Sequence, residues 1–235
     1  MSKKIVRIAL IVVGVIVLAV AGSFIYIWVS GGSGEPTREV EAEAVQPVDP
    51  QTAAYDVDRQ QSEARFIINE VLRGRPNTVV GTTNQIAGSI AIQFDPAAVE
   101  IGEFVINVRS IRTDDEVRDR TIRGQILESA RDEYEFSSFR PVEVANVPDV
   151  IAAGDTFEID VIGDLTVRDV TTRTTFAMEI SVESEDRISG LGRTTITWAE
   201  LDITIPYVGG DSIVASVADS LDLELAFVAN RRLLE

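Results

Sequence analysis

Apolar and polar residues alternate with a period of two along most of the chain beyond Tyr55. The alternation is clearest over residues 86–95, 104–109, 157–162, 176–182 and 221–227. Because successive side chains of a strand point to opposite faces, this period predicts strands that bury one face, as antiparallel sheets commonly do. With further strands over 64–71, 134–147 and 193–198, we expect an all-β fold of about eight antiparallel strands.

One segment in the middle of the chain breaks this period. Thr113 and Glu116 have the spacing of a capping box, in which each side chain satisfies the other residue's backbone donor. Behind them Val117, Ile122 and Ile126 recur at helical spacing. The pattern predicts one amphipathic helix over residues 114–127, inserted in the sheet.

Eight antiparallel strands either close into a barrel or pack as a sandwich. The choice bears on function, because an eight-stranded barrel can hold one small ligand whereas a sandwich has a solid interior. Gly88 and Gly163 lie among the inward-facing apolar positions, where a missing side chain leaves room. This favours a barrel with a cavity.

An uninterrupted apolar segment from Ile8 to Val29 precedes the predicted domain, with Lys3, Lys4 and Arg7 on its N-terminal side. As a helix it would be about 33 Å long, enough to cross a bilayer. The positive flank predicts a cytoplasmic N-terminus, with the rest of the chain on the other side of a bacterial cytoplasmic membrane. The alternative is a cleaved signal peptide with a site near Ala21, but an interfacial Trp28 favours a retained anchor.

The sequence therefore divides into four parts. Residues 1–30 form the basic flank and the transmembrane signal anchor, and residues 31–54, rich in Gly, Pro and Glu, form a flexible acidic linker. Residues 55–230 are long enough for one domain with its own core. Residues 231–235 form a C-terminal tail.

Composition excludes several classes of chemistry. The chain has no histidine and no cysteine, and it has no lysine beyond Lys4. Disulfides, Ser-His-Asp and Cys-His catalysis, thiolate metal sites and lysine-based nucleophiles are therefore excluded. We expect a protein that is not an enzyme, with no catalytic residues, no metal site and no cofactor. A hydrolase using two carboxylates stays a minor alternative, since nothing in the sequence places such a pair together.

Charge narrows the choice of partners. Lys3, Lys4 and Arg7 are three of the 21 basic residues, which leaves 18 arginines against 38 acidic residues and a formal charge of −20 beyond the apolar segment. So negative a domain repels phosphate backbones, and nucleic acid is excluded as a partner. A second copy of the chain, as a homodimer, stays open.

Several short motifs, in order along the chain, resemble the YceI family of polyisoprenoid-binding, lipocalin-like proteins from bacterial periplasms and envelopes. The motifs are Tyr55-Asp56-Val57-Asp58-Arg59 with Ala64-Arg65-Phe66, Val105-Ile106-Asn107-Val108-Arg109-Ser110-Ile111, Arg118-Asp119 with Ile122, and Gly163-Asp164-Leu165-Thr166-Val167-Arg168-Asp169-Val170-Thr171. Together they span the predicted domain. The resemblance implies a lipocalin-like barrel that encloses a long isoprenoid chain, such as a quinone tail or a polyprenol.

Three positions depart from the family pattern. Asn69 and Thr121 stand where histidine is common, and Trp198 stands where an arginine is usual. The polar roles of those family residues are therefore not carried over to this chain.

We expect the inward-facing large side chains to line a tunnel for such a lipid, and the inserted helix with two following phenylalanines to act as its lid. The candidate lining residues are Phe66, Ile68, Ile90, Ile92, Phe94, Ile106, Val108, Phe176, Met178, Trp198 and Phe227, and the candidate lid residues are Ile122, Ile126, Leu127, Phe136 and Phe139. Taken singly, each lining residue is better explained by a packed core, and the helix equally suits a plug. The alternative function is thus a structural or partner-binding envelope domain with a solid core.

Two charged clusters have a functional and a structural interpretation. Asp114, Asp115 and Glu116 could bind calcium, but acidic residues at a helix N-terminus more often complement its dipole. A basic cluster could hold a headgroup phosphate, but pairing with carboxylates on a solvated face is the preferred interpretation. It consists of Arg112, Arg118, Arg120 and Arg123.

Overall fold

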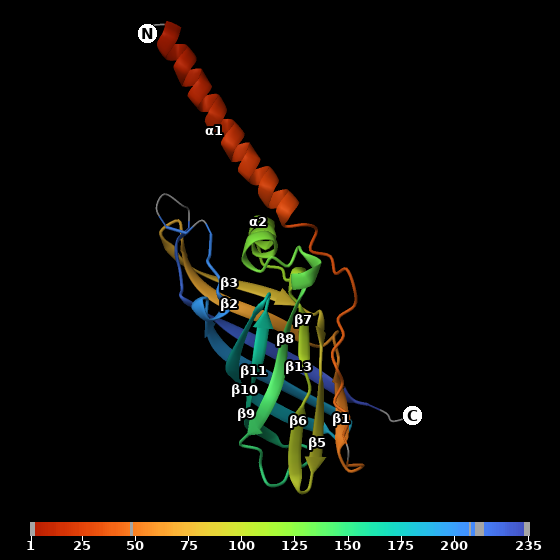
Figure 1. Ribbon diagram of the computed structural model, residues 1–235. Coiled ribbons are helices and arrows are strands. Elements are labelled where there is room, and N and C mark those ends of the chain that lie inside the picture. Colours follow the sequence, from red (N-terminus) through yellow and green to blue (C-terminus); the bar gives the residue numbers. More distant parts are fainter. Residues whose placement is uncertain (1–2, 48, 207, 210–213, 233–235) are drawn as a thin grey trace.

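A computed structural model describes residues 3–47, 49–206, 208–209 and 214–232, and it combines one long helix with a curled β-sheet (Figure 1). The side chains of Lys3 and Lys4 and the expected tail residues 233–235 lie outside the described part. The strands are β1 (Ala53–Val57), β2 (Glu63–Leu72), β3 (Arg75–Thr83), β4 (Ile86–Ala87), β5 (Ser89–Phe94), β6 (Ala97–Ile101), β7 (Phe104–Asn107), β8 (Phe136–Ala145), β9 (Thr156–Val167), β10 (Val170–Ser184), β11 (Arg187–Thr197), β12 (Val214–Val217) and β13 (Ser220–Arg231). The helical elements are α1 (Lys3–Ser30), α2 (Glu116–Thr121), the π-helical turn η2 (Ile122–Ile126), and the 3-10 turns η1 (Val108–Ser110), η3 (Asp132–Tyr134) and η4 (Ala199–Leu201).

All the strands belong to one sheet in which neighbouring strands are antiparallel. The order is β4-β7-β8-β9-β10-β11-β13-β1-β5-β6, and β2 pairs with β13, β3 and β12. In this order β4 lies at one end and β5 lies near the other. Only Gly88 separates the two strands in the chain, so the sheet must curl to bring its two ends together. The expected all-β antiparallel class is confirmed. The count of eight strands is not, because the described residues form thirteen strands.

The inserted helix is shorter than the sequence predicts and is divided in two. Regular α-helix covers only Glu116–Thr121, and the chain continues as the π-helical turn. The N-cap is Asp115, whose carboxylate accepts a hydrogen bond from the Arg118 amide at 2.8 Å. Thr113 is not the cap, because its hydroxyl donates instead to the carboxylate of Asp119 at 2.7 Å. A single helix over 114–127 is therefore not confirmed.

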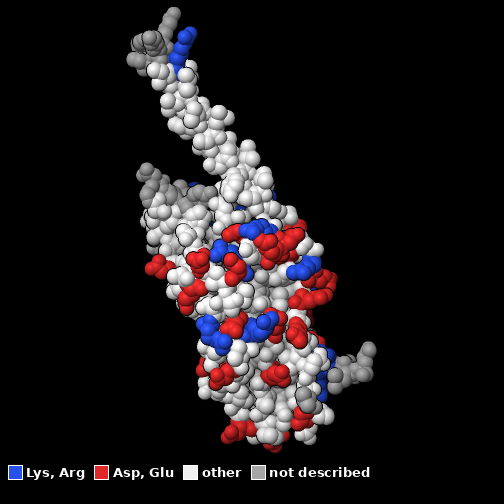
Figure 2. Space-filling view, in the orientation of Figure 1, with Lys and Arg blue, Asp and Glu red and all other residues white. Residues whose placement is uncertain are grey.

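Helix α1 projects away from the sheet and carries a bare apolar surface (Figures 1 and 2). Its residues Leu10–Ser30 are long and apolar enough to cross a membrane. The large side chains along it are mostly solvent-exposed, so the helix has no core of its own to join. Length and composition make it a candidate for a membrane anchor or for a signal sequence.

The segment between α1 and β1 has no regular structure, but it packs against the domain. Val40 and Val45 are buried, and the Val45 amide donates to Ser89 Oγ at 2.8 Å. Arg232 donates to the Val45 carbonyl at 2.8 Å and pairs with Asp56. Composition predicts an extended, mobile linker here. These two valines supply enough apolar surface for the described residues of the segment to lie along the sheet instead.

A buried polar network around Glu135 fastens this segment to the domain. Glu135 has no exposed surface, and its Oε1 accepts hydrogen bonds from Asn107 Nδ2 at 2.7 Å and from the Thr37 amide at 2.8 Å. The Thr37 hydroxyl and the guanidinium of Arg109, 3.3 Å away, contact Oε2. Burial raises the pKa of Glu135, but these hydrogen bonds and the arginine charge outweigh it, so the pKa lies below its usual value.

This network predicts a specific acid sensitivity. Because the folded-state pKa of Glu135 is depressed, its carboxylate contributes fully to stability above the unfolded-state pKa of about 4.3, and that contribution is lost as the pH falls from there through the lower folded-state pKa. We expect Glu135→Gln to lower the free energy of unfolding at neutral pH by about 2–4 kcal/mol, since Arg109 loses its buried partner. Urea denaturation of both proteins at neutral and acid pH measures this.

The difference between the two proteins should shrink as the pH falls. A matched control is Glu200→Gln, because Glu200 also has a depressed pKa but lies in an exposed turn. Equal stability of the wild type and Glu135→Gln at neutral pH would contradict the role given to the network.

Candidate ligand-binding site

The curled sheet encloses a cavity of about 610 Å³ at the end from which α1 projects. Its walls come from β2, β3, β7–β10, β12 and β13, and α2 with η2 covers one side. Ile27 of α1 also lines it. The volume lies within the range of about 300–1,000 Å³ that is usual for small-molecule sites.

Eleven of the sixteen residues predicted to line the tunnel or form its lid line this cavity. They are Phe66, Ile68, Ile106, Val108, Ile122, Ile126, Leu127, Phe139, Phe176, Met178 and Trp198. Their side chains come from six different elements (β2, β7, η1, η2, β8 and β10) and from the turns after η2 and β11, so no single segment forms the pocket. Phe139 and Phe176 pack edge to face, with ring centroids 4.7 Å apart, and they form one wall. The ligand-binding role of these residues stays a prediction, while their position around one apolar space is a structural finding.

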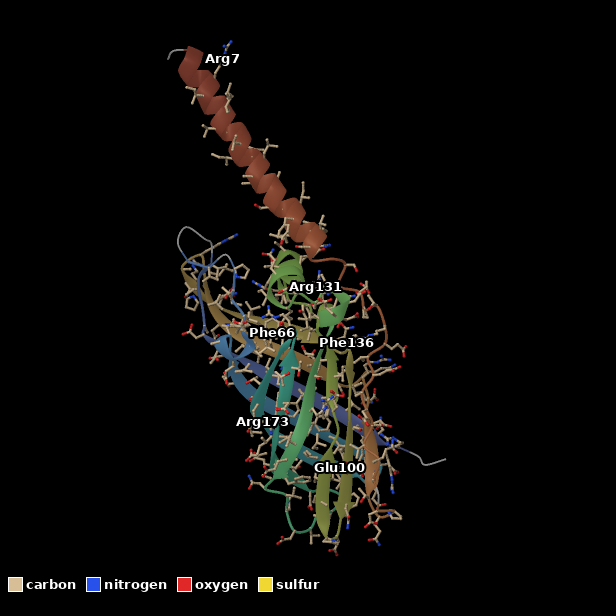
Figure 3. The ribbon with its side chains drawn as sticks, viewed as in Figure 1. Arg7, Phe66, Glu100, Arg131, Phe136 and Arg173 are labelled. Atoms are coloured by element: carbon tan, nitrogen blue, oxygen red, sulfur yellow. The ribbon has the colours of Figure 1, made fainter. Side chains whose placement is uncertain are left out.

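The other five predicted residues do not line the cavity. Ile90 and Ile92 have no exposed surface and fill the far end of the sheet, together with Tyr55. Phe227 is also buried, 6.2 Å from Phe104 between ring centroids, and Phe94 packs at the edge of the same core. Phe136 lies near the α1 end (Figure 3), but its ring packs under the Arg38 guanidinium at 4.6 Å. Period-two alternation places a residue inside the sheet without showing which end is filled.

Many residues that line the cavity were not predicted from the sequence. The missed residues include Ile27, Leu72, Val79, Phe104, Ile111, Val117, Leu165, Val167, Leu201, Ile203, Ile205, Leu221, Leu223 and Leu225. A signal was present for some of them: the alternation of β9 continues beyond Gly163 to Leu165 and Val167, and Leu201, Ile203 and Ile205 alternate with polar residues. Nothing in the sequence indicates that Ile27 of the apolar helix faces the domain.

Aromatic rings occupy the space beside the two glycines from which a cavity was predicted. A Cβ atom on Gly88 would lie 2.6 Å from Phe104 Cδ1, and one on Gly163 would lie 2.6 Å from Phe139 Cζ. Their missing side chains therefore let these rings pack against the backbone. The cavity is real, but these glycines do not create it.

Polar groups gather at the mouth of the cavity, between α2 and the β2–β3 hairpin. A guanidinium nitrogen of Arg118 lies 3.7 Å from Glu70 Oε1, so this ion pair joins the two sides of the mouth. Glu224 accepts hydrogen bonds from Arg65 at 2.6 Å and Arg193 at 3.1 Å. Burial raises the pKa of Glu224, but these two arginines hold it below its usual value. Arg118 and Glu70 at the mouth are thus paired with each other, and Glu224 is paired with two arginines of its neighbouring strands.

Inside the cavity the walls are apolar with few exceptions. Ser137 is the clearest exception, because its buried hydroxyl has no hydrogen-bond partner among the described residues. Within the described part of the chain no group of three acidic, histidine or cysteine residues could hold a metal ion. The arrangement can enclose an apolar molecule.

The acidic cluster has structural partners. Asp115 caps α2, Asp114 pairs with Arg118, and Glu116 pairs with Arg120 at 2.9 Å. Each side chain already meets a positive charge or an amide, which supports the helix-dipole interpretation over a calcium site.

The basic cluster serves two structural purposes. Arg118 and Arg120 pair with carboxylates, as the preferred interpretation expects. Arg123 differs, because it is 2 % exposed and donates from Nε to the Gly31 carbonyl at 2.8 Å. Burial, followed by the charge of Arg112, lowers its pKa. Arg123 thus binds the backbone directly after the C-terminal end of α1, and it does not lie on a solvated face.

With the geometry known, comparison with known proteins identifies the family. A family model described as YceI-like domain matches residues 55–229. The chain belongs to the YceI-like domain family. The resemblance in the sequence motifs is thereby confirmed, and it covers the whole curled sheet from β1 to β13.

Solved structures with the same fold are distant in sequence. A polyisoprenoid-binding domain from Saccharophagus degradans, described as implicated in plant cell wall breakdown, is 16% identical with a TM-score of 0.55, covering 77% of this chain and 99% of its own. BcnA from Burkholderia cenocepacia is 19% identical with a TM-score of 0.55, covering 74% and 99%. A YceI protein from Campylobacter jejuni is 16% identical with a TM-score of 0.51, covering 65% and 85%. No curated protein matches the chain.

The division into a hollow end and a filled end predicts opposite responses to added bulk. Ile106→Trp places an indole ring at the cavity wall, where there is space for it. We therefore expect little loss of stability but loss of ligand uptake. Ile90→Trp places the same ring where no space exists, and overpacking should cost about 1–3 kcal/mol. Urea denaturation of both variants, with uptake of a fluorescent prenyl alcohol, measures the two effects. If both variants were destabilised equally, the cavity end would be as solid as the far end.

Proposed function

We propose that this protein binds a long-chain isoprenoid or a similar apolar lipid inside a lipocalin-like barrel, without catalysis, as a carrier, store or sensor. The apolar cavity of about 610 Å³ carries this proposal. A solid core, which the structural alternative requires, would leave no such space. The YceI-like family and a polyisoprenoid-binding domain among the similar folds support the same class of ligand.

The strand pairing supports a closed barrel of eight continuous strands. Short breaks divide longer strands: β1 runs on to β2, β3 runs through β4 to β5, and β6 runs on to β7. Counted in this way, each of the eight pairs with two neighbours, and β13 meets β1 and β2 to complete the ring. Closure removes free edges and encloses the space at one end.

Burial of apolar surface is sufficient for binding. Each isoprenoid unit that leaves water buries about 100 Å², which contributes about 2–3 kcal/mol. Several units together offset the cost of association, about 4–15 kcal/mol, without one hydrogen bond. A lipid binder can therefore lack a recognisable polar motif, and the paired charges at the mouth are consistent with this.

We propose further that α1 is a retained anchor in the bacterial cytoplasmic membrane, with the domain on the extracytoplasmic side. The exposed apolar surface of α1 and the arginines that bind its C-terminal end support retention. A signal sequence that is removed needs no such contacts with the mature domain.

Lipid analysis of the purified protein tests the binding proposal. A shortened chain of residues 31–235 keeps the packed segment before β1 and can be purified without detergent. We expect native mass spectrometry and solvent extraction to find a co-purifying prenyl lipid. Ile106→Trp, made in the same shortened chain, should carry much less of it. A wild-type protein that emerges without lipid, and that takes up no prenyl alcohol or quinone afterwards, would contradict the proposal.

A further inference from the structure

The mouth of the cavity and the end of the apolar helix lie together. Ile27, one helical turn before the end of α1, lines the cavity alongside Val117 and Thr121 of α2. In Figure 1 the β2–β3 hairpin and β12 lie on the same side of the domain, beneath α1, while β5 and β6 reach the opposite end. An anchor in a bilayer would thus bring the mouth, and not the filled end, close to lipid.

Arginines from the lid region fix this orientation by binding carbonyl groups where α1 ends. Arg120 donates to the carbonyls of Gly32 at 2.6 Å and Trp28 at 3.2 Å, and its guanidinium stacks 3.5 Å from the centre of the Trp28 ring. Arg112 donates to the Gly34 carbonyl at 3.1 Å. The carbonyls at a helix C-terminus carry partial negative charge and lack intrahelical partners. This arginine clasp (Arg112, Arg120 and Arg123) connects α1 to the domain that it carries.

The rim of the mouth next to this clasp is suited to lipid. The β2–β3 hairpin turns at Arg73 and Gly74, both with positive φ, and exposes Arg73 and Arg75. Among the described residues, neither arginine has a hydrogen-bond or ion-pair partner. No acidic residue occurs between Glu70 and Asp95, although the chain has 38 of them. The apolar part of the rim includes Leu72 and the exposed Val208.

We propose that this rim docks on the leaflet from which α1 emerges, and that the ligand passes between bilayer and cavity through the mouth without crossing water. The inference rests on the proposed function and adds its partner, a lipid surface with anionic headgroups. Leu72 and Val208 contact the apolar side of the interface, and Arg73 and Arg75 bind lipid phosphates. Direct exchange avoids exposing a long apolar chain to water, which is the costly step for a free carrier.

Site-specific labels on the full-length chain in lipid vesicles test the docking. The chain has no cysteine, so Pro76→Cys on the hairpin and Val150→Cys in the segment after β8 each give one labelling site. Both residues are exposed. With a fluorophore on each and nitroxide-labelled lipids as quenchers, we expect several-fold stronger quenching at position 76 than at position 150. Equally weak quenching at the two positions would overturn the proposal.

Charge reversal separates docking from binding. In the Arg73→Glu/Arg75→Glu variant, quenching at position 76 should fall, and uptake of a dansylated farnesol from the same vesicles should slow several-fold. The affinity of this variant for dansylated farnesol in detergent should equal that of the wild type. Arg140→Glu/Arg173→Glu is the control, because both arginines are exposed, on β8 and β10, and Arg173 lies on the wall of the sheet away from the mouth (Figure 3). This variant should change neither the uptake rate nor the quenching.

The outcomes distinguish this inference from the proposed function. Normal probe binding in detergent with no difference in quenching between positions 76 and 150 would remove the docking and leave the binding intact. Strong quenching at position 76 with no probe binding in detergent would remove the binding function, and direct exchange with it. An uptake rate that the hairpin charges do not change would also overturn direct exchange.

Discussion

Burial of alternate side chains on the concave side of one curled sheet is the interaction on which the rest of the structure depends. At the far end the side chains meet and exclude all space: Tyr55, Ile90 and Ile92 have no exposed surface, and the Tyr55 hydroxyl donates to the Glu185 carbonyl at 2.8 Å. At the α1 end the same pattern leaves a cavity, which α2 covers without filling. One sheet therefore supplies both a stable core and a cavity.

Arginines have different partners at the mouth of the cavity and around the C-terminal end of α1. At the mouth Arg118 pairs with Glu70, and within the wall Arg65 and Arg193 pair with Glu224. Around the end of α1, arginines meet carbonyl groups, and Arg123 lies buried among them with Nη1 unpartnered in the described structure. Burying a charge is costly unless other groups compensate it. The carbonyls that follow α1 provide that compensation, so the helix and the domain stabilise each other.

The alternation of apolar residues was sufficient to predict the antiparallel sheet, and the short motifs were sufficient to predict the family. The class of ligand stays a prediction. Eleven of sixteen candidate site residues line the cavity, most of them because inward-facing positions repeat regularly along each strand. The pattern could not separate Ile106, in the wall, from Ile90, in the filled core, since both point inward. Whether an inward-facing residue lies in the wall or in the filled core depends on how strands that are distant in the sequence pair with one another.

Local helix signals were also insufficient, for a related reason. Thr113 fits a capping box by spacing alone, but the nearby carboxylate of Asp119 competes for its hydroxyl and Asp115 becomes the cap. The segment 31–54 has the composition of a flexible linker, yet Thr37 reaches Glu135, which is 98 positions further along the chain. Contacts between residues so far apart cannot be predicted from a local pattern.

The distribution of polar groups limits how the cavity can select its ligand. With apolar walls and paired charges at the mouth, most of the binding energy comes from area removed from water, which depends on the length and cross-section of the ligand. A headgroup would remain at the mouth, near Arg118 and the β2–β3 hairpin, where water and lipid phosphates compete for the same arginines. Selectivity should therefore follow the apolar chain more than the headgroup, and a polyprenol and a quinone with equal tails should bind with similar affinity. In the proposed function, the cavity would fix how much of the tail is enclosed, and a mouth that faces the membrane would leave the headgroup largely free.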